Sequence, residues 1–278
     1  MIGPGTIDCK GGIVTAMLTL KVCLEMGYPH HVRLLLNSDE EISNILGGER
    51  ELRFFGEAGR DFPCVLNCEV ASGNTAVVSQ KGILRQRIDI EGRGGHSGAA
   101  YFDCASAVRE AAYKIIALEE SSVPGGTTYN CSIVKGGVIP NAIPHQFSIT
   151  VDIRVRTMEE MEQARRFTAQ VAANSRVPGT HATVTTISSR PPMPDNPQTR
   201  VLYQRLDRIS REAGFGPLQE VHTGGGSDAA YTMEAGIPSI SGLGAWGDFA
   251  HSTDEYVYLP SVAQRAHLLV LYLLEYPQ

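Results

Sequence analysis

The sequence predicts a two-part α/β protein, in which a mainly parallel sheet domain is interrupted by an inserted ferredoxin-like α+β unit. Segments near both ends alternate helical periods with short apolar runs, a pattern typical of parallel strands buried on both faces. The middle instead carries strands with strict two-residue alternation. The proline-rich stretch Arg190–Pro197 is typical of a linker. We therefore expect one discontinuous domain, residues 1–80 and 192–278, and an inserted unit, residues 81–191.

Four elements are expected before residue 81, and they alternate between helix and strand. Gly27 is suited to end the first helix, since glycine adopts the left-handed conformation found there. Both apolar runs are short and uninterrupted, as in buried parallel strands. In chain order we expect a helix with Ile13, Met17, Leu20 and Leu24 at helical spacing, a strand over Val32–Leu36, a helix over Ser43–Phe55 and a strand over Cys64–Cys68.

The inserted unit is predicted from its strand alternation and from the order β-α-β-β-α-β, which is that of a ferredoxin-like unit. In its first helix we expect Val108, Ala112, Ile115 and Ile116 to face inward. Strands are expected over Ile83–Ile90, Tyr129–Val134, Phe147–Val155 and His181–Ile187, and helices over Cys104–Leu118 and Glu159–Ala173.

The C-terminal part returns to the α/β pattern of the first domain. A glycine-rich turn, Gly224–Asp228, is expected to open a helix there. The other elements expected are a helix over Gln198–Ala213, a short strand over Ile237–Ile240 and a final helix over Leu259–Leu274.

Composition excludes several classes of protein. The net charge of −6 gives no basic field that would attract nucleic acid. The longest apolar run, Leu268–Leu274, has seven residues and is far too short to span a membrane. No signal peptide is visible in the first 20 residues, and the six cysteines are scattered, which favours a reducing, cytoplasmic compartment. Cys64 and Cys68 are expected to be buried structural thiols rather than a metal knuckle.

Acidic residues stand at two places where a ligand site would lie, just before a helix and just after a strand. Asp8 precedes the first helix, where it is either the helix N-cap or part of a site that its flanking glycines allow to pack closely. Asp39, Glu40 and Glu41 follow an apolar strand, and three adjacent carboxylates repel one another unless a cation compensates them. The alternative for this triplet is a solvated acidic turn.

Two further candidates complete the set. Glu69 ends the second apolar strand and is either simply exposed or a ligand, and His251 lies in a loop, where a surface or core role is the alternative. Together, Asp8, Glu41, Glu69 and His251 offer three carboxylates and one imidazole, a set that suits Zn²⁺ or a similar divalent ion. Glu40 would then be a general base beside metal-activated water.

Two of these segments resemble motifs of a known enzyme family. Gly5–Gly12 is similar to a Gly-x-x-Asp-x-Lys-Gly-Gly block, and Ser38–Glu41 to an Asp-Glu-Glu block, of the zinc-dependent aminoacylase, acetylornithine deacetylase and glutamate carboxypeptidase family. The resemblance implies that Asp8 bridges two zinc ions and that Glu40 is the catalytic base. It also implies that Glu41, Glu69 and His251 are metal ligands.

Other positions match the family's substrate-contacting motifs in the correct order. His96, in Gly94–Ala99, is similar to a histidine that reaches the partner subunit's active site and stabilises the oxyanion. Asn141 matches a substrate-contacting asparagine, and Arg154 matches an arginine that grips the substrate carboxylate. Gly225 and Gly226 lie in a segment, Thr223–Asp228, that resembles the family's glycine-rich substrate loop.

The sequence departs from the family pattern in one motif. The family carries a His-x-Asp motif upstream of the bridging aspartate, and no His-x-Asp occurs in these 278 residues. One ion would keep Asp8, Glu41 and His251, whereas the other would keep only Asp8 and Glu69. We therefore expect an N-terminally truncated catalytic domain that binds one or two Zn²⁺, with Co²⁺ or Mn²⁺ as alternatives.

The resemblance implies hydrolysis of an amide bond in an N-acyl or peptidyl amino acid, with release of a C-terminal amino acid such as glutamate. An aminoacylase or deacetylase of other specificity is one alternative. A catalytically impaired module that only dimerises or binds is the other. A homodimer formed through the inserted unit is implied by the family, and no nucleic-acid or membrane partner is expected.

Overall fold

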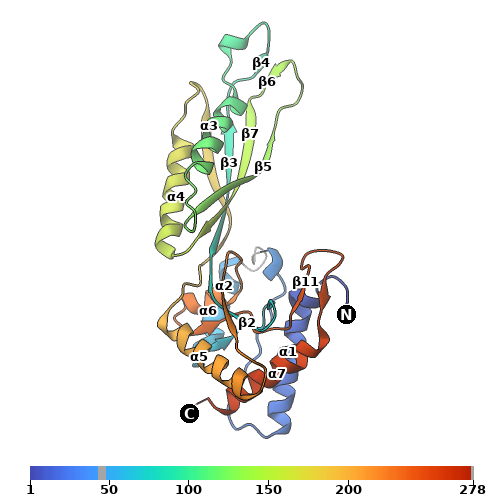
Figure 1. The fold of residues 1–278 in the computed structure, drawn as a ribbon. Coiled ribbons are helices and arrows are strands. Elements are labelled where there is room, and N and C mark those ends of the chain that lie inside the picture. Colours follow the sequence, from blue (N-terminus) through green and yellow to red (C-terminus); the bar gives the residue numbers. More distant parts are fainter. Residues whose placement is uncertain (43–47, 277–278) are drawn as a thin grey trace. The chain divides into compact units, whose positions relative to one another are not determined.

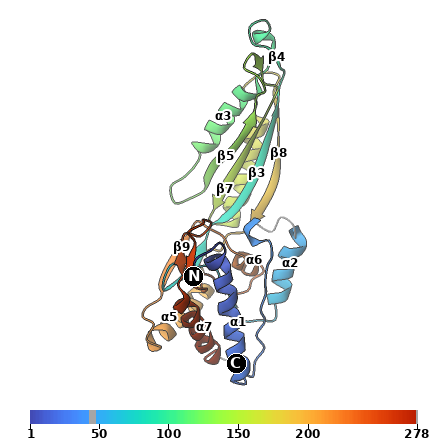
Figure 2. The same cartoon turned by 90° about the vertical axis from the view of Figure 1, so that its right-hand side faces the viewer.

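The computed structural model describes residues 1–42 and 48–276, which form a mixed α/β protein. The predicted mixture of helices and strands is therefore confirmed. The chain divides into two compact units, shown in Figures 1 and 2. Unit 1 comprises Met1–Gln80 and Met193–Gln278, and unit 2 comprises Lys81–Pro192. Among the described residues, no helix is long and apolar enough to cross a membrane.

Unit 1 consists of helices packed around short strand pairs. β1 pairs with β10 and β2 with β9, both in parallel, whereas β11 and β12 form an antiparallel pair. Its helices are α1 (Gly11–Glu25), α2 (Gly48–Gly59), α5 (Pro197–Glu212), α6 (Ala229–Glu234) and α7 (Leu259–Leu274). Its strands are β1 (Val65–Leu66), β2 (Thr75–Gln80), β9 (Gln219–Thr223), β10 (Ser239–Ile240), β11 (Gly247–Asp248) and β12 (Tyr256–Val257).

The core of unit 1 lies where α5 and α7 cover the parallel strands. Leu202 and Leu206 of α5 pack with Leu268 and Tyr272 of α7 in one buried apolar cluster, which also contains Ile240 of β10. α5 begins where the sequence provides a cap, because the Asn196 side chain accepts a hydrogen bond from the Thr199 N–H.

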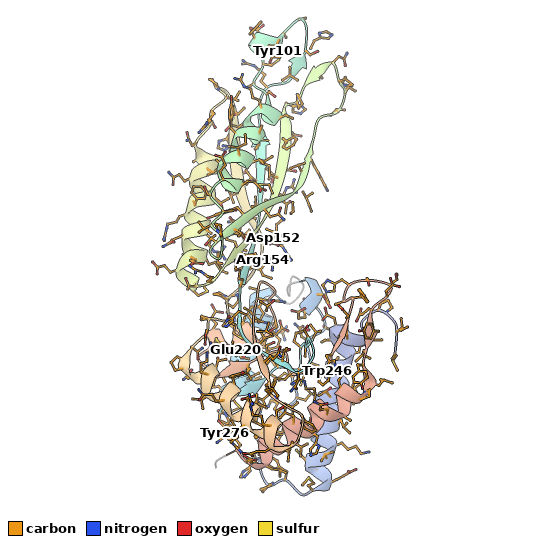
Figure 3. All side chains as sticks on the ribbon, in the orientation of Figure 1. Tyr101, Asp152, Arg154, Glu220, Trp246 and Tyr276 are labelled. Atoms are coloured by element: carbon orange, nitrogen blue, oxygen red, sulfur yellow. The ribbon has the colours of Figure 1, made fainter. Side chains whose placement is uncertain are left out.

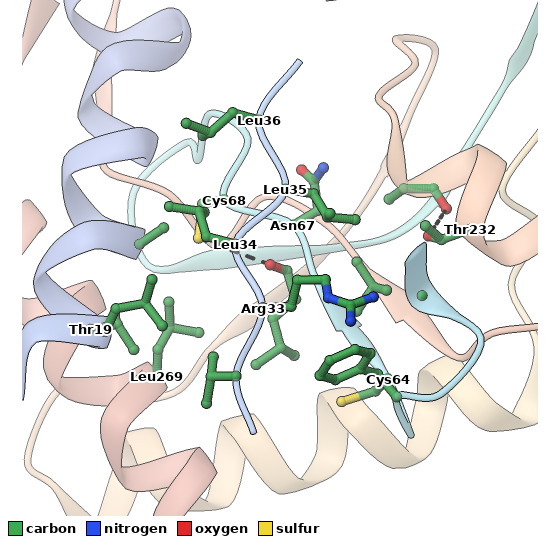
Figure 4. A pocket seen from close by; sticks show the side chains of 18 of the residues that line it. Thr19, Arg33, Leu34, Leu35, Leu36, Cys64, Asn67, Cys68, Thr232 and Leu269 are labelled. Atoms are coloured by element: carbon green, nitrogen blue, oxygen red, sulfur yellow. Dashed lines mark hydrogen bonds between the residues drawn. The ribbon is translucent and has the colours of Figure 1, made fainter. Parts of the chain in front are cut away.

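Two predictions for unit 1 need correction. The expected strand over Val32–Leu36 runs as an extended thread (Figure 4) but pairs with no strand among the described residues. Pairing is non-local, so an apolar run shows that a segment can form a strand but not that a partner lies beside it. The helix expected over Ser43–Phe55 is observed as α2 from Gly48 to Gly59, and residues 43–47 lie outside the described part.

Unit 2 is an antiparallel sheet with strand order β5-β7-β3-β8 and with α3 and α4 on one face (Figures 1 and 2). Ile149, Val151 and Ile153 of β7 are buried against these helices, as their two-residue alternation predicts. The elements are β3 (Gly82–Glu91), β4 (Gly95–His96), α3 (Ala107–Glu119), β5 (Thr128–Gly136), β6 (Ala142–Ile143), β7 (Gln146–Val155), α4 (Met158–Ala173) and β8 (His181–Arg190).

Of the four residues of α3 predicted to face inward, Ile115 packs against the core of unit 2, whereas the other three do not. Val108 and Ile116 are 38% and 53% exposed and Ala112 is exposed, whereas Glu110 and Lys114 are almost completely buried. Lys114 Nζ lies 2.8 Å from Glu110 Oε1 and donates to three carbonyl oxygens at the end of α4. The helix therefore turns its ion pair inward, because these carbonyls satisfy Lys114 and the N–H groups of Arg176 and Val177 donate to the Glu110 carboxylate.

Candidate metal centre

Three of the predicted metal ligands come together in unit 1. His251 Nε2 lies 2.8 Å from Asp8 Oδ2 and 3.5 Å from Glu41 Oε2. One ligand atom from each of the three residues lies within 4.8 Å of the others. Asp8 is not the cap of α1, because that position is held by Lys10 and no side chain bonds there. The alternative of a capping role is therefore excluded.

Each ligand comes from a different short segment. Asp8 lies in the turn Thr6–Lys10, which leads directly into α1 and whose backbone is not helical at Asp8 and Cys9. Glu41 lies in the turn Glu40–Ile42, which follows the extended thread. His251 lies in the loop between β11 and β12, and the pairing of these two strands holds the ends of the loop together. The three ligands are thus gathered by packing between segments that are up to 243 residues apart.

The backbone of the histidine loop is held in an uncommon conformation. Phe249 and His251 have φ angles of 59° and 65°, which lie in the left-handed region that residues other than glycine rarely adopt. Each such residue costs about 1–2 kcal/mol. A loop that keeps His251 in this conformation, with its ring against Asp8, is consistent with a functional rather than a merely exposed histidine.

Glu255 fixes the turn that carries Asp8, and sequence reasoning did not single it out. Its side chain is buried, and Oε1 accepts hydrogen bonds from the N–H groups of Ile7 and Asp8 at 2.8 and 3.0 Å. Oε2 accepts a third from Gly5 at 2.8 Å. Burial alone would raise the pKa of Glu255, but the three backbone donors and nearby His251 lower it. The available signal was an acidic residue four positions after His251.

A second cluster shares Asp8. Ligand atoms of Asp8, Cys9 and Glu69 lie within 4.8 Å of one another. Burial, followed by the negative charges of Glu40 and Asp8, raises the pKa of Glu69 well above its ordinary value. A cation among these carboxylates would reverse that shift. Burial also raises the pKa of the thiol of Cys9, a residue that sequence reasoning missed, and a cation at this cluster would lower it again.

Glu40 lies beside both clusters without belonging to either. It is half-buried, and its charge contributes to the raised pKa of Glu69 and of Cys9. The Asp8–Glu41–His251 cluster itself opens on a surface depression of about 490 Å³ that Lys10 also lines. A small molecule can therefore approach the three ligands from solvent.

The donor set fits a divalent metal ion. Two carboxylate oxygens and one imidazole nitrogen form a mixed set that suits Zn²⁺, and carboxylate-rich sites also suit Mn²⁺. Asp8 and Glu69, with the Cys9 sulfur beside them, offer a second place for an ion. Asp8 is the one residue common to both clusters, which is the position of a bridging carboxylate.

His96 and Asn141 lie together at one end of unit 2. His96 in β4 pairs with Ala142 in β6, and the Ser97 N–H donates to the Asn141 carbonyl at 3.0 Å. His96 Nδ1 accepts hydrogen bonds from the N–H groups of Gly98 and Ala99, both at 3.2 Å. The neutral ring therefore carries its proton on the exposed Nε2 atom, which can donate to a ligand.

Arg154 lies in β7 of the four-stranded sheet, at the end of that sheet away from the β4–β6 pair. In the pairing of β3 with β7, Arg154 lies opposite Ile83 at one end. The other end, toward His96, is the pair Glu91 and Gln146. Eight residues of β7 separate Gln146 from Arg154, which corresponds to about 27 Å. Figure 3 shows Arg154 and Asp152 at one end and Tyr101, from the turn after His96, at the other.

The guanidinium of Arg154 is held in place by an acid. Its Nε and Nη2 atoms donate to the two carboxylate oxygens of Asp152 at 2.6 and 3.2 Å. Arg85 Nε also donates to Asp152, at 3.0 Å. The Asp152 carboxylate thus orients two guanidinium groups, which are the side chains whose forked geometry suits a carboxylate ligand.

The predicted glycine-rich loop connects β9 to α6 in unit 1. Gly225 is exposed, and its N–H donates to the Thr223 hydroxyl at 3.1 Å. Gly226 is half-buried and precedes Ser227, whose hydroxyl donates to Gln80 at 2.8 Å within the core. Neither glycine belongs to the two clusters of metal-ligating side chains found among the described residues.

Comparison with known proteins identifies the family of this chain. The model of the family described as peptidase family M20/M25/M40 matches residues 1–275. Carboxypeptidase G2 of Pseudomonas sp. (strain RS-16) is 29% identical over 272 residues, which cover 96% of this chain and 65% of that protein. The chain thus spans 65% of the length of this curated relative.

Solved structures show the same fold at lower identity. A tripeptidase from Staphylococcus aureus aligns with a TM-score of 0.77 at 21% identity, over 95% of this chain and 69% of that one. Human carnosine dipeptidase 1 aligns with a TM-score of 0.69 at 14% identity, over 98% of this chain and 72% of that one. Because the family model matches almost the entire sequence, this chain belongs to peptidase family M20/M25/M40.

Proposed function

We propose that the protein hydrolyses an amide bond in a short peptide or N-acyl amino acid that has a free carboxylate. The single observation that carries this proposal is the convergence of Asp8, Glu41 and His251 on one point from three separate segments. These side chains would hold a divalent ion, Zn²⁺ in the first place, with Co²⁺ or Mn²⁺ as alternatives. Asp8 and Glu69 would hold a second ion if two are bound. Membership of a peptidase family supports the reaction class.

A divalent ion at this place lowers the pKa of a coordinated water and polarises the carbonyl of the scissile amide. The chain itself supplies the proton transfers. Glu40 stands beside the cluster and is the carboxylate left without a ligand role, so it accepts the proton of the attacking water. The same carboxyl group then donates that proton to the departing amine nitrogen.

Two residues of unit 2 provide recognition and charge stabilisation. His96 presents its Nε2–H group, which can donate to the carbonyl oxygen as negative charge develops there. Arg154, whose guanidinium is oriented by Asp152, would bind the carboxylate of the released amino acid. Asn141, joined to the His96 turn, is a further hydrogen-bonding group for the substrate, and Gly225 and Gly226 would line its path in unit 1.

The spacing within unit 2 supports a homodimer. A dipeptide extends over about 7 Å, whereas His96 and Arg154 of one chain lie at ends of a sheet about 27 Å apart. One small substrate therefore requires these two residues from different subunits. The exposed apolar side chains Val108 and Ile116 on α3, together with the edge strand β5, offer a surface for such pairing. Unit 1 would then be the catalytic domain and unit 2 the dimerisation domain.

The proposed reaction is tested with the zinc-loaded protein and a panel of N-acyl glutamates, other N-acyl amino acids and dipeptides. We expect release of the C-terminal amino acid, and Glu40→Gln should reduce kcat about 10²–10⁴-fold while metal content is retained. Asp254→Asn, a change of an exposed acid in the His251 loop, is the matched control and should be without effect. Turnover by Glu40→Gln equal to that of the control would refute the role of Glu40.

Mixing two variants tests the dimer. His96→Ala and Arg154→Ala should each be inactive alone, but their heterodimer contains one site with both residues intact. After subunit exchange, about one quarter of wild-type activity should return, because half of the dimers are mixed and each has one good site. If both residues act from the same chain, mixing restores nothing. A chain that binds metal but turns over no substrate would instead favour a binding module.

A further inference from the structure

The two acidic segments that supply Glu41 and Glu69 to the metal centre begin with the same local turn. Asn37 Oδ1 accepts a hydrogen bond from the Asp39 N–H at 3.1 Å. Asn67 Oδ1 accepts one from the Glu69 N–H at 2.9 Å. Each is an Asx turn, in which an asparagine side chain bonds to the backbone two residues further along the chain. The two asparagines therefore fix the course of the chain where each acidic segment begins.

Asn67 is held in place by a buried chain of hydrogen bonds. The Ser241 hydroxyl donates to the same Oδ1 atom at 3.1 Å. Gln80 Nε2 donates to Ser241 Oγ at 3.5 Å, and the Ser227 hydroxyl donates to Gln80 Oε1 at 2.8 Å. Ser227 and Ser241 are completely buried and Gln80 is 6% exposed, so each polar group depends on its protein partner. The chain of bonds thus connects Ser227 to the turn that carries Glu69.

Asn37 is bonded to the residue that follows Ser227. Its Nδ2 atom donates to Asp228 Oδ2 at 2.6 Å. Asp228 is 8% exposed, and a hydrogen bond to a carboxylate is stronger than one between neutral groups. Asp228 occupies the N-cap position of α6, but its side chain makes no capping hydrogen bond there. Its bond to Asn37 therefore connects Asp228 to an acidic segment rather than to the start of its own helix.

Ser227 and Asp228 lie at the end of the glycine-rich loop between β9 and α6, and they connect this loop to both turns. Ser227 is linked to the turn that carries Glu69. Asp228 is linked to the turn that leads to Glu41. Glu69 and Glu41 belong to the two different clusters of metal-ligating side chains. Two consecutive residues of the chain thus reach one acid of each cluster.

Ser239 provides a contrast within the same core. It is completely buried, as Ser227 is, and its hydroxyl bonds to the Thr232 hydroxyl and to the Ile237 carbonyl. These two bonds join α6 to the segment before β10, and they involve neither asparagine. Removal of the Ser239 hydroxyl therefore breaks buried hydrogen bonds without touching either turn.

We propose that Ser227 and Asp228 are positioning residues of the metal centre. Ser227 holds Glu69 through one Asx turn. Asp228 holds Glu41 through the other. This role rests on the proposed function, in which both acids bind metal ions. Because each residue acts on a different turn, its replacement should loosen one acid and leave the other in place, whereas a residue that only stabilises the core would loosen both or neither.

Hydrogen exchange of single backbone amides in the metal-free chain, followed by NMR, tests the two connections. In Ser227→Ala the Glu69 amide should exchange about fivefold faster, the factor expected for the loss of one hydrogen bond, while the Asp39 amide is unchanged. Asp228→Ala should give the reverse, and Ser239→Ala should change neither amide. Equal acceleration of both amides in Ser227→Ala or in Asp228→Ala, or of neither, would overturn the proposal.

Titration of Zn²⁺ into the same variants tests the consequence for the metal centre. Asp228→Ala should weaken binding of the ion that His251→Ala also weakens, by about tenfold, and Ser227→Ala should weaken binding of the other ion to a similar extent. Ser239→Ala should leave both affinities unchanged. A wild-type chain that binds no Zn²⁺ would refute the proposed function, and the exchange result would still decide whether the turns are positioned in this way. Unchanged Zn²⁺ affinity in both Ser227→Ala and Asp228→Ala would overturn the positioning role.

Discussion

Glu255 offers the sharpest test of how the fold positions the metal centre. Its carboxylate accepts hydrogen bonds from three N–H groups of the turn that carries Asp8. A buried donor left without a partner costs about 1–3 kcal/mol, so Glu255→Ala would cost roughly 3–9 kcal/mol. That is a large part of the usual 5–15 kcal/mol of a folded domain. Glu255→Gln is the better probe because its amide oxygen can keep two of the bonds.

In Glu255→Gln the amide NH₂ faces the third N–H group, and the charge that strengthens all three bonds is lost. We expect a cost of about 2–4 kcal/mol. Trp246, the single tryptophan, lies in unit 1 and reports urea unfolding by fluorescence. Asp254→Asn, next to Glu255 but exposed, is the control and should change stability by less than about 0.5 kcal/mol. The reasoning is refuted if both variants unfold at the same urea concentration.

The acid stability of unit 1 should change in the same variant. Because the pKa of Glu255 is lowered in the folded protein, its stabilisation is fully present above its unfolded pKa of about 4.3. It is lost as pH falls through the lower, folded value. We therefore expect the stability gap between wild type and Glu255→Gln to close below about pH 4, as measured by urea unfolding across pH.

Two further predictions concern charges elsewhere. Glu69 has a raised pKa, so its favourable contribution is complete below about pH 4.3 and is lost as pH rises through the folded value. Glu69→Gln should accordingly stabilise the metal-free chain at neutral pH in urea unfolding, and a less stable variant would contradict this cause. Lys114→Met should cost about 3–5 kcal/mol because it leaves Glu110 buried without its cation. Lys21→Met, which breaks the exposed pair with Glu25, is the control and should cost about 0.5 kcal/mol or less by circular dichroism.

The sequence was most informative where structure is local. Strict alternation predicted β7 within one residue, and the final helix was predicted over Leu259–Leu274, where α7 is observed. β9 was missed, since Gln219–Thr223 is polar and lies between turns, so its pairing with β2 leaves no periodic signal. Three of the four residues predicted for the inward face of α3 were wrong because apolarity alone cannot show that a distant helix end will accept a buried lysine.

The residues of the candidate site also fall into those that the sequence could predict and those that it could not. Asp8, Glu41 and His251 could be proposed because acids and histidine stood at predicted element ends, where ligands gather. Cys9 and Glu255 could not, because their places depend on how the chain folds around Asp8. The extended course of residues 31–36 was foreseen, but its lack of a strand partner is a property of the whole sheet rather than of the apolar run.

The most direct test of the metal centre is calorimetric titration of Zn²⁺ into the metal-free chain and into His251→Ala. The wild type should bind at least one ion, and the loss of His251 should weaken the tighter site by about 100-fold or more. His222→Ala removes an exposed histidine that bonds only to Ser79 and Glu220 in the described structure, and it should leave binding unchanged. Equal Zn²⁺ affinity in the wild type and His251→Ala would contradict the assignment of Asp8, Glu41 and His251 as the metal site.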